Sequence, residues 1–380
     1  MDSPASRPSA VAGDAAAVAV APPVANQQPD ATKIELLWAG SPDGVERGLV
    51  TQAGIPYRAI QTGQLRGTNP LTALANAGKM AVGVRQSLQL VDEFRPDVCL
   101  VTGGYVCTPV AIACRLRRVP VLIYLPDMTP GLAIRWLSRL ATQVAVSFPD
   151  VAAHFGDKAV VTGYPVRPEL LEAAADRVAT RRRLGQTLDI DWSLRGEDGQ
   201  PLPLVLVFGG SQGARSINKA VWAGLPDLLP YCQILHVIGT RDWPLYQEAQ
   251  PALPSPLQGR YHPVAYLHDE MMQALAAADL AVARAGASTL AEFPLTRLPA
   301  VLVPLPISGN HQMPNARKLA DTGGAMIIKD SDLGAQLTST VLGLLQDENR
   351  RLKMSADMAS LSQPGAAKNL ADVVLNLGRK

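Results

Sequence analysis

Short apolar runs alternate with amphipathic helical stretches along the chain from Lys33 onward. The runs of the first half, which predict its strands, are residues 34–38, 98–101, 119–125 and 144–148. Those of the second half begin at Leu204, Ile234, Leu280, Val301 and Met326. Alternation of this kind specifies a parallel sheet that helices cover on both faces. The pattern therefore predicts an α/β fold with two doubly wound, Rossmann-like parallel-sheet domains.

Two polar stretches, residues 162–167 and 189–203, interrupt this alternation and predict connectors. Residues 1–30 are rich in Ala, Pro, Ser and Val and have no basic cluster before their apolar run, which favours a flexible or degenerate arm over a secretory signal. The other predicted parts are an N-terminal domain over 31–165, a C-terminal domain over 166–363, and a last helix over 364–380 that could pack on the N-terminal domain.

The most informative local pattern is a strand, a glycine turn and a helix around Gly209. The apolar run 204–208 breaks into Gly209-Gly-Ser-Gln-Gly213, and a helix-compatible stretch follows at once. Glycines let the main chain approach a ligand closely, and the following helix directs free N–H groups and a positive dipole end at an anion. The segment predicts a phosphate site, although a tight turn in any parallel-sheet protein would look the same.

A second turn of this kind follows strand 280–283, with small residues at 285–287 and Ser288 or Thr289 near the helix N-cap. Glu292 lies three residues after Thr289, so the two could form a capping box. The same carboxylate could accept hydrogen bonds from a ribose diol, and both roles are compatible.

A third strand-to-helix turn, residues 304–310, precedes a helix that begins at His311. Because the carboxyl ends of parallel strands lie at one edge of a sheet, the three turns together predict a nucleotide crevice.

Composition narrows the function further. The chain has 380 residues, of which 47% are hydrophobic, so it can bury two cores. A formal net charge of +2 argues against a nucleic-acid binder, and no apolar run is long enough for a membrane helix. The four cysteines have no metal-ligand spacing and predict reduced, packed thiols; they are Cys99, Cys107, Cys114 and Cys232.

Four segments resemble the motifs of one family: Gly163-Tyr-Pro-Val-Arg167, Gly209-Gly-Ser-Gln-Gly-Ala-Arg215, Arg284-Ala-Gly-Ala-Ser-Thr-Leu-Ala-Glu292 and Asn310-His-Gln-Met-Pro-Asn-Ala316. They are similar to the MurG-type N-acetylglucosaminyltransferases of glycosyltransferase family 28, and the resemblance extends from about residue 34 to the C-terminus. It implies the GT-B architecture, in which two such domains face a cleft. The donor UDP-N-acetylglucosamine would bind the C-terminal domain, and the acceptor and membrane would contact the N-terminal domain.

The resemblance also implies residue roles. Main-chain groups of Tyr266 and Leu267 would bind uracil, and Glu292 would bind ribose. The groups along the diphosphate would be Arg167, Ser211, Gln212, Ala287, Ser288 and Thr289. Gln312 and Asn315 would face the sugar hydroxyls, and Gly103, Gly104 and Tyr105 would lie on the acceptor side. Simpler interpretations remain open: Arg167 as a solvated linker charge, Arg215 paired within its own domain, and Gln312 and Asn315 bonded to backbone. We expect no metal or other cofactor, because helix N-termini and Arg167 can stabilise the charge on the diphosphate.

The chain departs from the family on the acceptor side. Family members open with a strand and a Gly-Gly-Thr-Gly-Gly-His loop, whereas residues 9–17 contain no histidine. A His-Glu-x-Asn run is also replaced, here by Tyr124-Leu-Pro-Asp127. Asp127, at the end of strand 119–125, is the best remaining candidate for the general base, although it could instead form an Asx turn before the helix at Pro130.

An apolar stripe with a basic rim could bind a membrane surface or pack in the core; it comprises Leu71, Leu74, Met80, Val84 and Leu88 with Arg66, Lys79 and Arg85. The leading hypothesis is an inverting transferase, peripheral at the cytoplasmic face of the cell membrane. It would move N-acetylglucosamine to a polyprenyl-diphosphate-linked N-acetylmuramyl-pentapeptide. Alternatives are another acceptor, a homologue that binds the nucleotide sugar without turnover, and a UDP-N-acetylglucosamine epimerase. A first strand and loop formed by residues 1–30 would favour catalysis.

Overall fold

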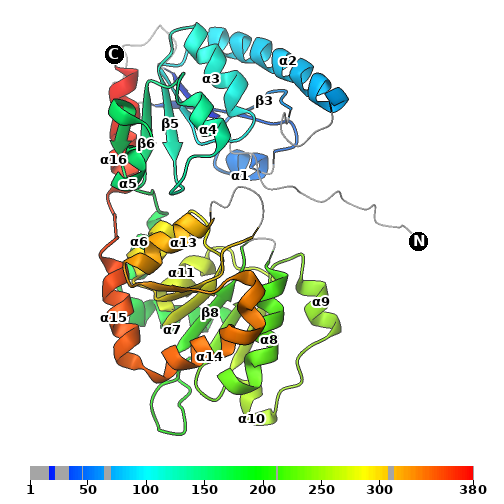
Figure 1. Ribbon diagram of the computed structural model, residues 1–380, viewed down its shortest axis with the longest axis vertical. Helices are drawn as coiled ribbons and strands as arrows, with labels where there is room; N and C mark the ends of the chain where they lie inside the picture. The colour runs from blue at the N-terminus through cyan, green and yellow to red at the C-terminus, as the bar shows by residue number, and fades with distance from the viewer. Residues whose placement is uncertain are drawn as a thin grey trace, which may run out of the picture. The chain divides into compact units, whose positions relative to one another are not determined.

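The computed structural model describes residues 17–21, 34–44, 46–63, 70–210, 213–306 and 312–379, with the backbone alone at 17–21 and 70–74. The chain forms two compact units, residues 1–163 with 368–380 and residues 164–367. Each unit contains one β-sheet with helices packed against it (Figure 1), which confirms the α/β prediction.

The first unit contains a seven-stranded sheet of order β3-β2-β1-β4-β5-β6-β7. Its strands are β1 (Ala17–Ala21), β2 (Glu35–Gly40), β3 (Tyr57–Ala59), β4 (Val98–Val101), β5 (Val121–Leu125), β6 (Gln143–Val146) and β7 (Ala159–Val161). Its helices are α1 (Arg47–Gln52), α2 (Pro70–Phe94), α3 (Cys107–Leu116), α4 (Leu132–Leu137), α5 (Pro149–Ala152), the 3₁₀ turn η1 (Gly156–Lys158) and α16 (Ala366–Gly378). All five residues of β5 are buried, as expected for a parallel strand covered on both faces.

Strand β1 corrects two expectations. Residues 17–21 are a central strand rather than part of a flexible arm, and this strand runs antiparallel to both neighbours, so the first sheet is mixed rather than wholly parallel. Ala17 pairs with Val101, so the chain enters β1 at the edge where β4 ends and leaves it at the opposite edge.

The C-terminal helix belongs to the first unit. Leu377 of α16 is buried in a cluster with Val98, Leu122 and Tyr124. The Nδ2 atom of Asn369 also donates a hydrogen bond to the carbonyl of Thr162, at 3.3 Å. The apolar face of α16 therefore covers the strands β4 and β5.

The second unit contains a six-stranded sheet of order β10-β9-β8-β11-β12-β13, in which every pair is parallel. Its strands are β8 (Leu204–Phe208), β9 (Gln233–Val237), β10 (Tyr261–Val264), β11 (Leu280–Ala283), β12 (Ala300–Leu302) and β13 (Ala325–Ile327). Its helices are α6 (Pro168–Ala175), α7 (Arg177–Leu188), α8 (Arg215–Leu228), α9 (Trp243–Glu248), α10 (Ser255–Gln258), α11 (Glu270–Ala277), α12 (Thr289–Thr296), α13 (Gln312–Asp321), η2 (Asp330–Asp332), α14 (Leu333–Gln346) and α15 (Glu348–Ala359). The strand order reverses between β8 and β11, where open α/β sheets bind their ligands.

Three further expectations concern helices and cysteines. All four cysteines are buried and unbridged, as predicted. Within the described ranges, no helix is long and apolar enough to cross a bilayer.

On α2, which packs against α3, the stripe residues Met80, Val84 and Leu88 are half-buried, so packing explains them better than a membrane contact. The side chains of Leu71 and Leu74, and residue Arg66, lie outside the described part of the chain.

Candidate functional site

Three strand-to-helix turns of the second unit start side by side. Ala283, the last residue of β11, pairs with Phe208 at the end of β8 and with Leu302 at the end of β12. The turns that lead into α8, α12 and α13 therefore open on one edge of the sheet, at its switch point. The three turns that the sequence predicts therefore lie at one edge of the sheet, and the nucleotide crevice stays a prediction.

The first turn requires glycine at two described positions. Gly213 has φ +87°, and a Cβ added to it would lie 2.3 Å from the carbonyl oxygen of Ile238. A Cβ on Gly209 would lie 2.2 Å from the Cβ of Ala214. Side chains are thus excluded from a turn that leads into the N-terminus of the long helix α8, where main-chain N–H groups and the helix dipole favour an anion. Ser211 and Gln212 lie outside the described residues.

The arginine after this turn is structural. The Nε and Nη2 atoms of Arg215 donate to Oδ1 of Asp242, at 3.2 and 3.1 Å. This confirms the interpretation that Arg215 pairs within its own domain.

The second turn is anchored by Arg284, which directly follows β11. Its Nη2 donates to Oγ of Ser216 at 2.8 Å, and its Nη1 donates to the carbonyl of Val303 at 3.1 Å and to the carboxylate of Asp330. Ser216 in turn donates to Asp330 at 2.7 Å. These bonds connect the starts of α8, α12 and η2, so the two turns are fixed relative to each other.

The main chain of the second turn offers donors. Thr289 uses both its N–H and its hydroxyl, at 3.2 and 2.6 Å, to donate to the carbonyl of Gly286, which closes the turn. Among the described residues, no backbone carbonyl accepts a hydrogen bond from the N–H of Ala287 or Ser288. Those two amides, at the beginning of α12, are therefore the donors that a phosphate could use.

The capping-box interpretation of this helix is wrong. The N-cap residue is Ser288, and no side chain caps the helix start. Glu292 is consequently one position too far along the helix to be the reciprocal partner in a capping box. Its side chain instead shares a hydrogen bond with the side chain of Ser288.

Glu292 and Arg167 lie close enough to interact electrostatically. Burial raises the pKa of the Glu292 carboxyl above its usual range, and the Ser288 hydrogen bond and the charge of Arg167 lower it in part. Arg167 itself is exposed, at the N-cap position of α6. A partly desolvated carboxyl and an exposed cation therefore lie near the second turn, and the role of Arg167 stays a prediction.

The third turn is tied to the second through two amide side chains. Gln312 Oε1 accepts a hydrogen bond from the N–H of Leu305 at 2.9 Å, and the buried Asn315 donates from Nδ2 to the carbonyl of Ala285 at 3.3 Å. Both side chains thus make the backbone bonds that the simpler interpretation expects. The Nε2 group of Gln312 is the donor that could face a sugar. His311 lies outside the described residues.

Tyr266 and Leu267 follow β10 after Ala265, at the same edge of the sheet. The carbonyl of Ala265 accepts a hydrogen bond from the N–H of Gly239, at 3.0 Å, which joins this loop to the end of β9. Leu267 is buried, whereas Tyr266 is 42% exposed and packs edge-on against His268. The loop is therefore fixed at its start and presents an aromatic ring to its surroundings.

The acceptor-side candidates of the first unit also gather at one edge. Gly103, Gly104 and Tyr105 follow β4, Asp127 follows β5, and these two strands are parallel neighbours. Asp127 and Tyr105 are half-buried. The structure thus brings together the predicted glycine turn and the candidate base.

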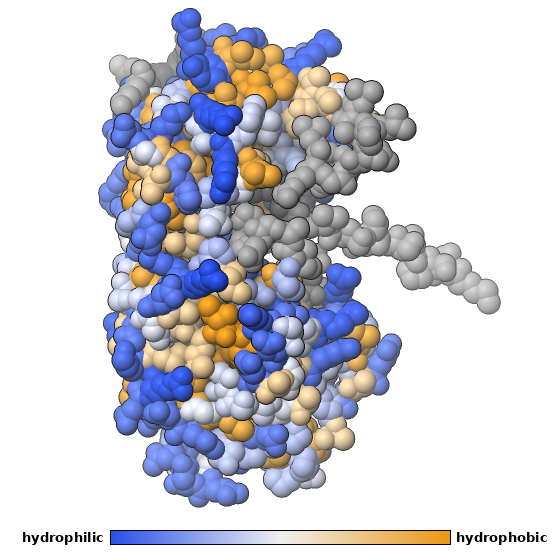
Figure 2. Space-filling view, in the orientation of Figure 1, coloured by the Kyte–Doolittle hydropathy of each residue, from blue (hydrophilic) through white to orange (hydrophobic). Residues whose placement is uncertain are grey.

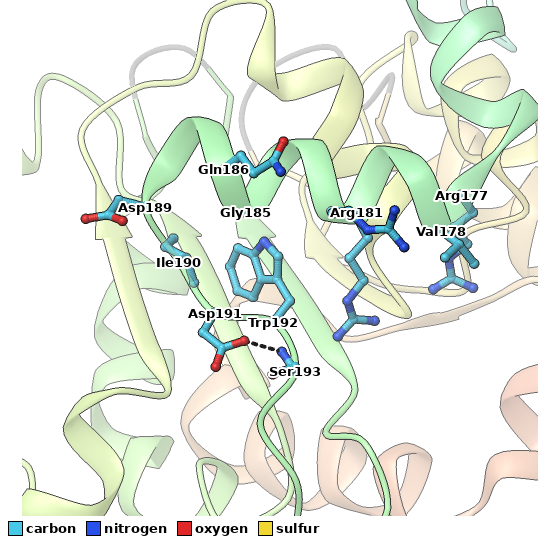
Figure 3. Close-up of a pocket in the computed structure, with 11 residues that line it drawn as sticks. Arg177, Val178, Arg181, Gly185, Gln186, Asp189, Ile190, Asp191, Trp192 and Ser193 are labelled. Atoms are coloured by element: carbon cyan, nitrogen blue, oxygen red, sulfur yellow. Dashed lines mark hydrogen bonds between the residues drawn. The ribbon is translucent and has the colours of Figure 1, made fainter.

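A separate cavity of about 790 Å³ lies away from these turns. It is lined by α7 and the loop after it, including Arg177, Arg181 and Trp192 (Figure 3). Both arginines are paired with Asp279, which also accepts a hydrogen bond from the N–H of Leu204 at the beginning of β8. This cavity is therefore at the amino edge of the sheet, opposite the turns, and we do not assign the substrate to it. In the described part of the chain, no three His, Cys, Asp or Glu side chains group as metal ligands.

Comparison with known proteins identifies the family. The chain matches the models of the glycosyltransferase family 28 N-terminal domain, over residues 15–146, and C-terminal domain, over residues 204–370. It is 40% identical over 380 residues to the UDP-N-acetylglucosamine--N-acetylmuramyl-(pentapeptide) pyrophosphoryl-undecaprenol N-acetylglucosamine transferase of Roseiflexus sp., covering 90% of this chain and 83% of that protein.

The transferase of the same name from Desulforudis audaxviator is 37% identical over 378 residues, covering 96% of this chain and 95% of that one. The crystal structure of Acinetobacter baumannii MurG superposes with a TM-score of 0.69 at 26% identity, with 90% of each chain covered. The chain therefore belongs to glycosyltransferase family 28, among the MurG-type N-acetylglucosamine transferases of GT-B architecture.

Proposed function

We propose that this protein transfers N-acetylglucosamine from UDP-N-acetylglucosamine to a polyprenyl-diphosphate-linked N-acetylmuramyl-pentapeptide, a step of peptidoglycan synthesis. The observation that supports the donor most directly is the set of three adjoining turns at the switch point of the second sheet. The acceptor rests on the relatives, whose names state it and which match nearly the whole chain.

The reaction is an inverting displacement. An acceptor hydroxyl attacks the anomeric carbon of the sugar, its proton passes to a base, and UDP leaves from the opposite face. Negative charge builds on the diphosphate as the bond breaks, and fixed N–H donors that point at it lower the barrier. The turns before α8 and α12 supply such donors, and Asp127 supplies the carboxylate that we assign as the base.

We assign the donor contacts to the following residues. Ala287 and Ser288 donate main-chain N–H groups to the diphosphate, and Arg167 adds its positive charge. The carboxylate of Glu292 accepts hydrogen bonds from the ribose hydroxyls. The main chain at Tyr266 and Leu267 binds the uracil edge. Gln312 and Asn315 complete the sugar site, and Ser211, Gln212 and Thr289 complete the diphosphate turns.

Transfer can be tested with labelled UDP-N-acetylglucosamine, with and without the lipid-linked muramyl-pentapeptide. We expect release of UDP and labelling of the lipid only when the acceptor is present. Rapid transfer to another lipid, with none to the muramyl-pentapeptide, would replace the acceptor in this proposal.

A second candidate function is binding of the nucleotide sugar without turnover. Residues 9–17 favour it, because they contain no histidine where family members carry the Gly-Gly-Thr-Gly-Gly-His loop. The same assay separates the two functions, since a binding-only protein would retain UDP-N-acetylglucosamine and release no UDP under either condition.

Glu292→Gln tests the ribose contact through its pH dependence. The pKa of Glu292 is raised in the folded protein. At pH values just above the usual pKa of a glutamate, the folded protein without ligand therefore binds more protons than the unfolded chain. Its free energy of unfolding should therefore fall as the pH rises through that window. Donor binding should strengthen over the same window, because the ribose hydroxyls donate to the carboxylate.

Calorimetric titration of UDP at several pH values measures this effect. Glu292→Gln should bind UDP about tenfold more weakly at neutral pH, as expected for loss of a hydrogen bond to a charged group. Its affinity for UDP should no longer fall as the pH is lowered. The exposed Glu248→Gln serves as a matched control and should behave as the parent protein. If the affinity of Glu292→Gln for UDP still falls as the pH is lowered, Glu292 does not bind the ribose.

We further propose that α4 docks the protein on an anionic membrane surface. Leu132 and Trp136, one helical turn apart, are 63% and 45% exposed, and Arg135 and Arg139 are exposed beside them. Figure 2 shows apolar and hydrophilic side chains next to each other on the first unit over α3 and α4. An amphipathic Trp, an exposed Leu and nearby arginines are what an interfacial helix needs to reach a lipid-linked substrate.

Sedimentation with phosphatidylglycerol vesicles tests this surface. The double variant Leu132→Ser and Trp136→Ser should lower the vesicle-bound fraction at least about tenfold, because each apolar side chain contributes roughly 1.5–3 kcal/mol when buried. Leu352→Ser, which changes a residue with 61% exposure in the second unit, is the matched control. Equal binding by the double variant and the control would refute the assignment of α4.

A further inference from the structure

A chain of buried polar side chains lies behind the first turn of the second unit. The indole N–H of Trp222 is 3.0 Å from Oη of Tyr261, and that hydroxyl is 3.0 Å from Nδ1 of His236. The Nε2 of His236 is 3.0 Å from Oδ1 of Asn218, whose Nδ2 is 3.2 Å from Oδ2 of Asp242. These residues come from α8, β9, β10 and the start of α9 and have no role in the reaction described above.

Each hydrogen bond between these polar side chains has a fixed direction. Asn218 Nδ2 also donates to the carbonyl of Ile238, at 3.0 Å, and a carbonyl can only accept. The Oδ1 of Asn218 must therefore accept from His236, which places a proton on Nε2 of that ring. Burial lowers the pKa of His236 to about 3, so the ring is neutral and its Nδ1 accepts from the hydroxyl of Tyr261. Each side chain in the series thus donates a hydrogen bond to the next one, from Trp222 to Asp242.

The series of hydrogen-bonded side chains ends next to Gly213. A Cβ on Gly213 would lie 2.3 Å from the carbonyl oxygen of Ile238 and 3.3 Å from Oδ2 of Asp242, and Asn218 donates to both of these oxygens. Asp242 is 3% exposed and also pairs with Arg215, the first residue of α8. The polar chain therefore fixes the two atoms beneath the turn and the first residue of the helix above it.

We propose that His236 and Asn218 are positioning residues for the donor diphosphate. By holding Ile238 and Asp242 in place, they keep Gly213 and the N-terminus of α8 in position for the phosphates. This inference rests on the proposed function, because it assumes that the turn binds UDP-N-acetylglucosamine. Loss of the donor to Asn218 would leave buried acceptors unsatisfied, and the turn would relax toward them.

Two variants of His236 separate positioning from packing. Glutamine can retain a donor where Nε2 lies and so keep the bond to Asn218. Asparagine can retain an acceptor where Nδ1 lies and so keeps only the bond to Tyr261. We expect His236→Gln to bind UDP within about threefold of the parent protein. His236→Asn should bind at least about tenfold more weakly and raise the KM for UDP-N-acetylglucosamine by a similar factor, with the KM for the lipid acceptor unchanged.

The control is Gln233→Leu, since Gln233 is an equally buried polar residue of β9 at the opposite edge of the sheet. Asn218→Ala, which removes both the acceptor for His236 and the donor to Ile238, provides a second comparison if His236→Asn does not fold. A role in folding alone would lower the amount of active protein and leave both KM values unchanged.

If the parent protein binds UDP and a folded His236→Asn or Asn218→Ala variant binds it equally well, the positioning role is refuted while the proposed function stands. If the parent protein itself binds no UDP, the proposed function fails and the inference fails with it.

Discussion

Replacing Gly213 with alanine is expected to lower kcat/KM for UDP-N-acetylglucosamine at least about 100-fold. The residue has φ +87°, and the new methyl group would meet the carbonyl of Ile238 at 2.3 Å. The turn must therefore change conformation, which moves its N–H groups away from the diphosphate. Loss of one preorganised donor to a developing negative charge typically lowers rates by about 10² to 10³. Steady-state kinetics with varied donor and saturating acceptor measure the effect.

The matched control is Gly259→Ala, because Gly259 lies in the same unit with negative φ and with nothing within 4 Å of an added Cβ. This variant should retain full activity. Gly213→Ala should also lose some stability, since an alanine at positive φ is disfavoured by about 1–2 kcal/mol. A folded Gly213→Ala protein with normal donor kinetics would show that the first turn does not contact the donor.

Replacing Asp127 with asparagine is expected to lower kcat about 10² to 10⁴-fold, the usual contribution of a general base, and to leave the affinity for UDP unchanged. Asparagine resembles aspartate in shape and forms the same Asx turn, but it cannot take the proton from the acceptor hydroxyl. Single-turnover transfer with preformed enzyme and donor gives the rate of the chemical step directly.

Asp157→Asn, an exposed carboxylate elsewhere in the first unit, should leave the rate unchanged. If Asp127→Asn transfers at the parent rate while Asp127→Ala is slow, the side chain serves the turn before α4 and is not the base. Normal rates in both variants would exclude Asp127 from catalysis altogether.

The alternation of apolar runs and helical stretches predicted the central parallel strands of both sheets, because each such strand and its neighbouring helix leave a local pattern. It missed the short edge strands β3, β7 and β10. The direction of β1 has no such pattern. An apolar run at residues 17–21 is compatible with either direction, and its pairing with Val98–Val101 depends on contacts far away in the sequence.

The candidate site was predictable where its requirements are local and not where they depend on distant residues. Gly209 and Gly213 stand out because a turn that excludes side chains needs glycine, and that requirement is local. The anchors beneath the turn are not local, since Asn218, His236 and Asp242 come from different elements. Glu292 shows the limit of spacing rules, because the helix begins one residue earlier than a capping box with Thr289 requires.

A calorimetric titration of UDP into the purified protein tests the diphosphate site most directly. Main-chain donors at the ends of β8 and β11 should give one binding site per chain, with heat released as the phosphates exchange water for fixed N–H groups. Binding should weaken sharply in Gly213→Ala and remain unchanged in Gly259→Ala. Folded protein that binds neither UDP nor UDP-N-acetylglucosamine would contradict the account.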